Sequence, residues 1–168
     1  NEIVVSGASV RIKSEYRKNT DTSHVSVLVP YETDSIKSEV KKYLECLLNA
    51  GFEVYFKLRT DVSRQEQITK SLLDDFNHPN LHMIENTDSV IGKIDVVAGN
   101  YSTFLYDMIA YHKPVALLET ANDFGNGLVE NGLAEMVTLE NAATEIKRIA
   151  ATAPDEAVER LLAMRALR

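Results

Sequence analysis

Residues 94–118 read IDVVAGNYSTFLYDMIAYHKPVALL and contain, in order, a buried strand, a helix and a second buried strand. The runs 94–99 and 115–118 are apolar enough to lie at the centre of a parallel sheet. Between them, residues 102–112 carry apolar side chains on one helical face and stop before a lysine–proline pair, where proline disfavours further helix. This unit predicts a right-handed strand–helix–strand crossover in an α/β protein.

The same alternation continues on both sides of this unit, with short connections. It predicts a single Rossmann-like, doubly wound, mainly parallel sheet of about six strands flanked by helices, with the first and fourth strands adjacent at the centre. Residues 1–23 fit this pattern poorly, so we expect a linker or extended segment there and one domain over residues 24–168. The predicted strands are 24–30, 52–58, 81–84, 94–99, 115–118 and 135–139, and the predicted helices are 36–49, 63–76, 88–93, 102–112, 142–151 and 155–167. Gly51 suits a left-handed cap at the end of the first helix, and Ser63 with Glu66 predicts a capping box at the start of the second.

Length and composition exclude several classes of protein. The 168 residues carry a formal net charge of −7, one cysteine, no tryptophan and 45% hydrophobic residues. A chain of this length can bury a sizeable core without disulfides or metal. No apolar run approaches the roughly 18 residues of a membrane span, and the acidic balance disfavours a nucleic-acid surface. The single cysteine leads us to expect a reducing, cytoplasmic compartment.

The sheet topology selects two candidate binding segments. In open α/β sheets, ligands bind outside the carboxyl ends of the strands, where the strand order reverses. One segment contains Tyr31 and Glu32, after the first strand, and the other contains Asn100, Ser102 and Thr103, after the fourth. The two hydroxyls stand where a helix is predicted to begin, and the free N–H groups of a helix start suit a phosphate or diphosphate. The serine is equally compatible with a plain helix N-cap, and a cap can do both.

Charged side chains lie at the ends of two other predicted strands. Lys57 and Arg59 alternate to the same side of the second strand, near the crevice, where two cations could neutralise a nucleotide diphosphate. A solvated strand end is the commoner outcome for such a pair. Glu119, after the fifth strand, could bind sugar or glycerol hydroxyls, although its glycine-containing loop is equally compatible with a plain surface loop.

Motifs of other enzyme classes are absent from the sequence. There is no G-x-G-x-x-G after the first strand, no G-x-x-x-x-G-K-[ST] and no G-x-S-x-G. The four histidines have no metal-ligand spacing, and no cysteine partners them. We therefore predict no metal and no bound cofactor, and the sequence identifies no catalytic residue.

Residues 95–115, from DVVAG to KPV, resemble a signature of the C-terminal, nucleotide-binding half of GT-B-fold transferases, of the CDP-glycerol glycerophosphotransferase and capsular polysaccharide transferase type. The resemblance also covers the first strand–helix unit and the strand GFEVYFK, about residues 24–150 in all. It implies a donor linked to a nucleotide such as CDP or UDP. It further implies an N-terminal domain outside this chain, and the start at asparagine rather than methionine fits a piece of a longer protein. A whole enzyme of this kind would be peripheral to the inner face of the membrane.

The resemblance also assigns roles by position. The hydroxyl pair at the helix start would hold the donor diphosphate, Lys57 would match the lysine of a K-x-H-P motif, and backbone groups near Glu85 would face the nucleobase. Arg59 replaces the histidine of that motif, and Asn100 replaces the usual aspartate. These departures leave donor identity and activity open.

Three interpretations follow. The leading one is the donor-nucleotide-binding domain of a surface-polysaccharide glycosyltransferase or glycerophosphotransferase, of capsule or teichoic-acid-like type, which is inactive without its N-terminal partner. A second is a nucleotide-sugar epimerase or hydrolase domain of the same fold. The third is a non-catalytic Rossmann-like binding module, which the two departures from the family pattern permit.

Overall fold

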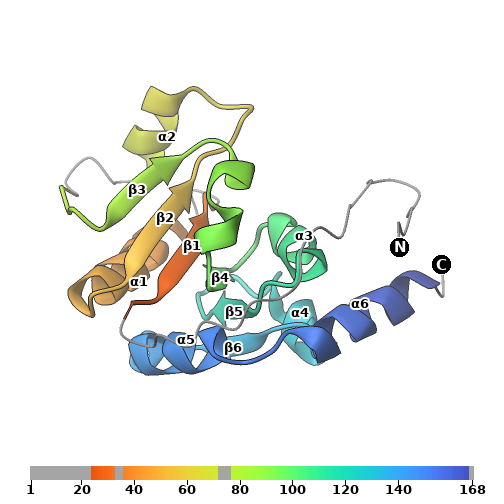
Figure 1. The fold of residues 1–168 in the computed structure, drawn as a ribbon. Coiled ribbons are helices and arrows are strands. Elements are labelled where there is room, and N and C mark those ends of the chain that lie inside the picture. Colours follow the sequence, from red (N-terminus) through yellow and green to blue (C-terminus); the bar gives the residue numbers. More distant parts are fainter. Residues whose placement is uncertain (1–23, 33–35, 72–76, 167–168) are drawn as a thin grey trace.

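The computed structural model describes residues 24–32, 36–71 and 77–166, and the predicted linker, residues 1–23, lies outside them. Strands and helices alternate along the described chain, as the sequence predicts (Figure 1). The strands are β1 (Ser26–Pro30), β2 (Glu53–Lys57), β3 (Leu81–Ile84), β4 (Val96–Gly99), β5 (Val115–Leu118) and β6 (Glu135–Val137). The helices are α1 (Lys37–Asn49), α2 (Arg64–Ser71), α3 (Phe104–Ala110), α4 (Asn126–Glu130), α5 (Ala142–Ala150) and α6 (Asp155–Ala166), with two 3₁₀ turns, η2 (Thr87–Ser89) and η3 (Ile91–Lys93).

The strands form one parallel sheet in the order β3-β2-β1-β4-β5-β6. β1 and β4 are neighbours at the centre, with Val27 opposite Val96, which confirms the predicted topology. The order reverses between these two strands, so right-handed crossovers on either side of this point place their helices on opposite faces. The chain is therefore a doubly wound Rossmann-like domain, and its switch point lies between β1 and β4.

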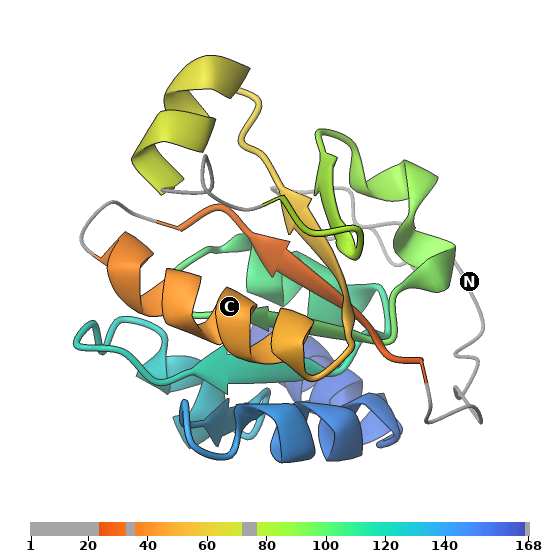
Figure 2. The ribbon, with the colours of Figure 1, turned by 90° about the vertical axis from the view of Figure 1, so that its left-hand side faces the viewer.

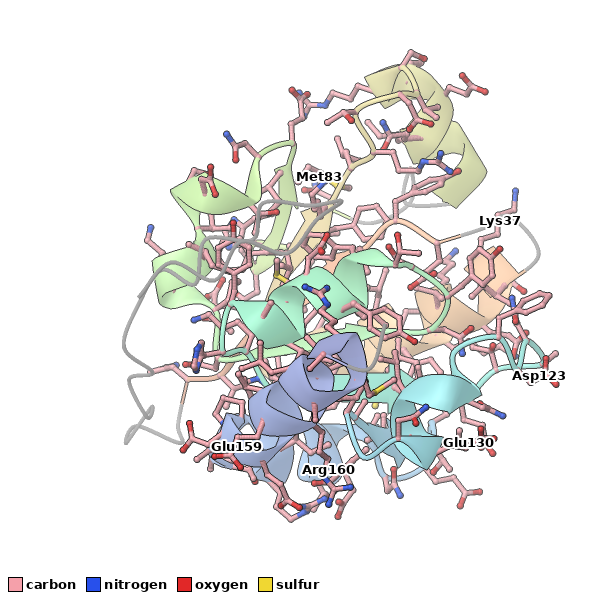
Figure 3. All side chains as sticks on the ribbon, turned by 90° about the vertical axis from the view of Figure 1, so that its right-hand side faces the viewer. Lys37, Met83, Asp123, Glu130, Glu159 and Arg160 are labelled. Carbon is pink, nitrogen blue, oxygen red and sulfur yellow. The ribbon has the colours of Figure 1, made fainter. Side chains whose placement is uncertain are left out.

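The sheet divides the apolar core into two layers. Val27 and Val29 point to one face of β1 and Leu28 to the other, and all three are almost completely buried. α1 and α5 lie side by side against the first face (Figure 2). α3, α4 and α6 cover the second face, with α3 and α6 in contact (Figure 3). The central strands β1 and β4, which flank the switch point, are thus covered on both faces.

Local turn chemistry sets the limits of two helices as predicted. Gly51 follows α1 with a φ of 85°, and its N–H and that of Phe52 bond to the carbonyls of Leu48 and Leu47. This is the glycine-ended Schellman arrangement expected from the sequence. At the start of α2, the Ser63 hydroxyl accepts the N–H of Glu66 at 3.3 Å, which confirms the predicted serine cap.

Three elements differ from the prediction. α3 begins at Phe104 rather than two residues earlier, because the Ser102 hydroxyl accepts the Phe104 N–H at 3.2 Å in a turn that precedes the helix. The predicted helix at 88–93 is the pair of 3₁₀ turns, η2 and η3. α4 was not predicted at all. No helix in the described part of the chain is long and apolar enough to cross a membrane.

Candidate functional site

A cleft of about 610 Å³ opens at the carboxyl end of the sheet, between the segments that follow β2 and β3 and one face of α3. This volume lies within the roughly 300–1,000 Å³ of typical small-molecule sites. The residues that line the cleft are Lys57, Thr60, Glu85, Asn86, Thr87, Asp88, Ile91, Phe104, Asp107, Met108 and Tyr111.

One stripe of α3 forms an apolar wall of this cleft. Phe104, Met108 and Tyr111 are spaced four and three residues apart, so they lie along the same side of the helix. Ile91, from η3, adds an aliphatic surface. Asp107 stands within the same stripe and places a carboxyl group among these apolar side chains. A wall of this kind suits a flat ring that also carries hydroxyl or amino groups.

The charges of the cleft are unevenly divided. Lys57 is the only cation among the described residues that line it, and its Nζ lies 5.4 Å from the centroid of the Phe104 ring and 3.0 Å from the Leu58 carbonyl oxygen. Burial lowers the pKa of this lysine. Carboxyl groups come from three lining residues, and burial raises the pKa of Asp107, while Arg165 opposes that effect. Carboxylates accept hydrogen bonds from hydroxyl and amino groups, whereas a lysine attracts an anion.

Two buried polar atoms have no hydrogen-bond partner within the described chain, the Thr87 hydroxyl oxygen and the Asn100 side-chain oxygen. Buried polar groups are rarely unpaired in folded proteins. Thr87 belongs to the wall of the cleft, and Asn100 to the loop after β4 at the switch point. The unpaired Thr87 hydroxyl therefore lies beneath the surface of the cleft wall.

Glu32 crosses the switch point from β1 to the loop after β4. Its Oε1 accepts the Asn100 N–H at 2.8 Å, and its Oε2 accepts the Tyr101 N–H at 3.1 Å. Burial raises the pKa of Glu32 to about 7, although these N–H groups act in the opposite direction. The predicted ligand-facing carboxylate is thus a buried group that binds the protein's own backbone.

The Asn100 side chain ties the ends of two strands together. Its Nδ2 donates to the Leu118 carbonyl at 2.7 Å and to the Asn122 carbonyl at 3.3 Å. A Cβ on Gly125 would lie 2.1 Å from the Asn100 carbonyl oxygen, so only glycine allows this close approach. Asn100 therefore organises the loops after β4 and β5 rather than lining the cleft.

Three further predicted residues lie outside the cleft lining. The Tyr31 ring packs edge-on against Phe56, with centroids 6.4 Å apart. Arg59 is half exposed and forms a bidentate pair with Asp61. The Glu119 side chain is exposed.

The structure thus brings together only part of the predicted site. Lys57 and Glu85 line the cleft, while Ser102 and Thr103 directly precede its α3 wall. Sequence reasoning missed Gln67, which is buried and fixes the loop after β2 by donating to the Arg59 and Val62 carbonyls and accepting the Arg59 N–H. No local pattern marks a single glutamine for such a role.

No cluster of three or more His, Cys, Asp or Glu side chains in residues 24–32, 36–71 and 77–166 could hold a metal ion.

Comparison with known proteins identifies the fold. No protein-family model and no curated protein matches the sequence. Among solved structures, the chain is similar to the spinosyn rhamnosyltransferase SpnG, with a TM-score of 0.58 and 15% identity over 89% of this chain and 45% of that one. It is also similar to the glycosyltransferase VinC in complex with dTDP, with a TM-score of 0.55 and 12% identity over 83% of this chain and 38% of that one. A third is a protein described as a UDP-N-acetylglucosamine 2-epimerase from Listeria monocytogenes, with a TM-score of 0.51 and 14% identity over 90% and 46%.

These likenesses define a class of fold. The chain has the Rossmann-like fold of the C-terminal domains of GT-B glycosyltransferases, which an epimerase shares. It spans less than half the length of each of these three proteins. At identities of 12–15% the likeness concerns the fold, and the ligand has to be argued from the site itself.

Proposed function

We propose that this chain is the donor-nucleotide-binding domain of a surface-polysaccharide glycosyltransferase or glycerophosphotransferase of capsule or teichoic-acid-like type. In this proposal, catalysis needs an N-terminal partner domain that supplies the acceptor site and the general base. The observation that carries the proposal is the cleft between β2, β3 and α3, which combines an apolar wall, several carboxyl groups and one lysine on a GT-B-type fold.

The division of charge suggests how a nucleotide would lie in the cleft. The nucleobase would contact the wall of Phe104 and Tyr111, near the backbone at Glu85, and Asp107 would accept hydrogen bonds from ribose hydroxyls. The diphosphate would lie toward Lys57 and the hydroxyls of Ser102 and Thr103, where a cation and hydroxyl donors offset its charge. The same groups would stabilise the departing nucleotide while an acceptor hydroxyl attacks the donor, without a bound metal.

Titration with CDP, UDP, GDP and dTDP tests the binding proposal. We expect one of them to bind with a dissociation constant below 1 mM, roughly, because the cleft has the volume and polarity of a small-molecule site. Replacing both Lys57 and Ser102 by alanine should then weaken binding by about 1–3 kcal/mol through lost charge-assisted hydrogen bonds. No binding of any of the four would overturn the proposal, and unchanged affinity in the double variant would move the site away from this cleft.

The likeness to an epimerase supports a second candidate class, a nucleotide-sugar epimerase or hydrolase. A nucleotide-sugar epimerase or hydrolase domain would bind the same nucleotides, so the two readings differ in the sequence that precedes residue 1. A partner half that carries an acceptor site favours the transferase. A non-catalytic Rossmann-like module is expected to bind none of the nucleotides.

The group that the donor nucleotide carries distinguishes a glycosyltransferase from a glycerophosphotransferase. With the nucleotide identified, affinities for its glycerol-linked and sugar-linked forms can be compared with that of the free diphosphate. We expect the true donor to bind at least as tightly as the diphosphate, because its transferred group gains contacts at the same crevice. A glycerol-linked donor that binds more weakly than the sugar-linked one would remove the glycerophosphotransferase reading.

A further inference from the structure

Glu32 holds the backbone of the switch-point loop from the opposite strand. Its two carboxylate oxygens accept the N–H groups of Asn100 and Tyr101, at 2.8 and 3.1 Å, and the N–H of Ser102 also favours its ionised form. Gly99 makes room for this contact, because a Cβ there would lie 2.9 Å from Glu32 Oε1. The carboxylate thus binds the run of N–H groups that lies between β4 and α3.

The same loop carries a buried polar atom that no other described residue satisfies. The Asn100 side-chain oxygen has no hydrogen-bond partner, although the residue is only 1% exposed. The polar groups of this loop are therefore arranged around one internal carboxylate and remain incompletely paired. An external anion that approaches the loop meets N–H groups already engaged by a negative charge.

We propose that Glu32 is a positioning residue of the nucleotide site, an internal anion whose negative charge opposes a diphosphate bound beside the 100–103 loop. This inference rests on the proposed function. Protonated Glu32 still holds the loops after β1 and β4 together, but it does not repel the diphosphate. Nucleotide affinity therefore falls as Glu32 ionises. Two like charges about 7 Å apart near a protein surface repel by about 2 kcal/mol, which is enough to be measured as a change in affinity.

The pKa of Glu32 is set by burial and by backbone N–H groups, and the value of about 7 places its ionisation within an accessible pH range. Asp34 is near in sequence but outside the described residues. The charged side chains on α1, β2, α3 and the loop after β5 are Lys37, Glu39, Lys41, Lys42, Glu45, Glu53, Lys57, Asp107, Glu119 and Asp123.

The test compares nucleotide affinity at pH 6 and pH 8 in wild-type protein, Glu32→Gln and Glu130→Gln. The probes are CDP, UDP, GDP and dTDP. Their own phosphate ionisation changes over this range, but it cancels in the ratio of the wild-type dissociation constant to that of Glu32→Gln. We expect this ratio to rise about fivefold between pH 6 and pH 8, the effect of a Glu32 pKa that nucleotide binding raises from about 7 to about 8. Glu130 is an exposed α4 carboxylate, so its variant should follow the wild type at both pH values (Figure 3).

The outcomes are distinguishable. If no probe binds the wild type, the proposed function fails and this inference fails with it. If a probe binds and the ratio is the same at both pH values, the inference on Glu32 fails alone. Should Glu32→Gln not fold, carboxyl carbon NMR of wild-type protein gives the same answer. Because coupling is reciprocal, saturation with the nucleotide should raise the pKa of Glu32 by about one, and an unchanged pKa overturns the inference.

Discussion

Lys57 is the residue on which the electrostatics of the cleft depend most. It is the one cation among the described lining residues, and it shares the cleft with three carboxyl-bearing side chains. Lys57→Met should therefore weaken a nucleoside diphosphate about tenfold or more and leave the parent nucleoside unaffected, because only the diphosphate needs the ammonium group. Calorimetric titration with both ligands measures the difference. Lys147→Met, on the exposed side of α5, is the matched control, and equal losses for nucleoside and diphosphate would argue that Lys57 acts through packing.

Glu32 makes the stability of the domain depend on pH. Its folded pKa of about 7 exceeds the 4.5 of an ordinary glutamate, so the protonated form favours the folded state. Its stabilising contribution is therefore complete below about pH 4.5 and is lost as the pH rises to 7, by about 3 kcal/mol in total.

Urea unfolding of wild-type protein and Glu32→Gln at several pH values between 4.5 and 8 isolates this contribution. Glutamine cannot ionise, so the difference in free energy of unfolding between the two proteins should change across the window and level off above pH 7. Glutamine also leaves one backbone N–H without an acceptor, which lowers stability by about 1–3 kcal/mol at every pH. A difference that is constant with pH would mean that Glu32 is ionised throughout.

At the scale of elements, the loop after β5 is fixed by one close backbone approach. A methyl group on Gly125 would lie 2.1 Å from the Asn100 carbonyl oxygen and 2.6 Å from Leu117 Cδ1. Gly125→Ala should therefore displace α4 or the loop after β4 and destabilise the fold by about 1–3 kcal/mol. Thermal or urea unfolding measures this loss.

Gly127 provides the control within the same helix. A Cβ there meets nothing within 4 Å, and the residue lies inside α4. Gly127→Ala should be neutral or stabilise by about 0.5–1 kcal/mol, because alanine loses less backbone entropy in a helix. Equal effects of the two substitutions would show that helix propensity, rather than the approach to Asn100, determines the outcome.

The elements that the sequence predicted are those with local signals. The glycine that ends α1 and the serine that starts α2 act on groups a few residues away, and the structure confirms both. α4 has five residues, and its glycine and asparagine give it neither helix propensity nor a periodic apolar pattern. Its helix forms because Leu128 packs into the core beneath it.

The site was predictable only where topology alone decides position. Lys57 is the last residue of β2 and Glu85 directly follows β3, so the rule for open α/β sheets places them at the crevice. Glu32 follows a strand end too, but its partners lie 68 and 69 residues further along the chain, and no local pattern shows that its carboxylate turns inward. The stripe of Phe104, Asp107 and Tyr111 was visible as a helical spacing, yet its apolar members fit a packing role equally well.

At the scale of the whole molecule, the cleft lies at the carboxyl end of the sheet, and this domain forms one side of it. The described domain supplies the wall, the lysine and the carboxyl groups on that side, and it is less than half the length of the similar structures. In the proposed function the acceptor site and the general base come from a partner domain, so a donor bound to this wall alone stays in contact with water on its other side. Binding and catalysis should therefore separate in this chain.

The corresponding prediction is that the isolated chain binds a nucleotide donor but does not turn it over. Incubation with UDP-N-acetylglucosamine and with CDP-glycerol, followed by chromatography of the released nucleotide, should give the same rate as Lys57→Met and as buffer alone. If the chain is joined to the partner domain of the proposed function, the joined protein should release nucleotide faster than the buffer control when an acceptor is present, since positioning of two reactants supplies much of a transfer enzyme's rate. Turnover by the isolated wild-type chain that Lys57→Met abolishes would contradict the need for a partner domain, because the reacting groups would then all lie on this side of the cleft.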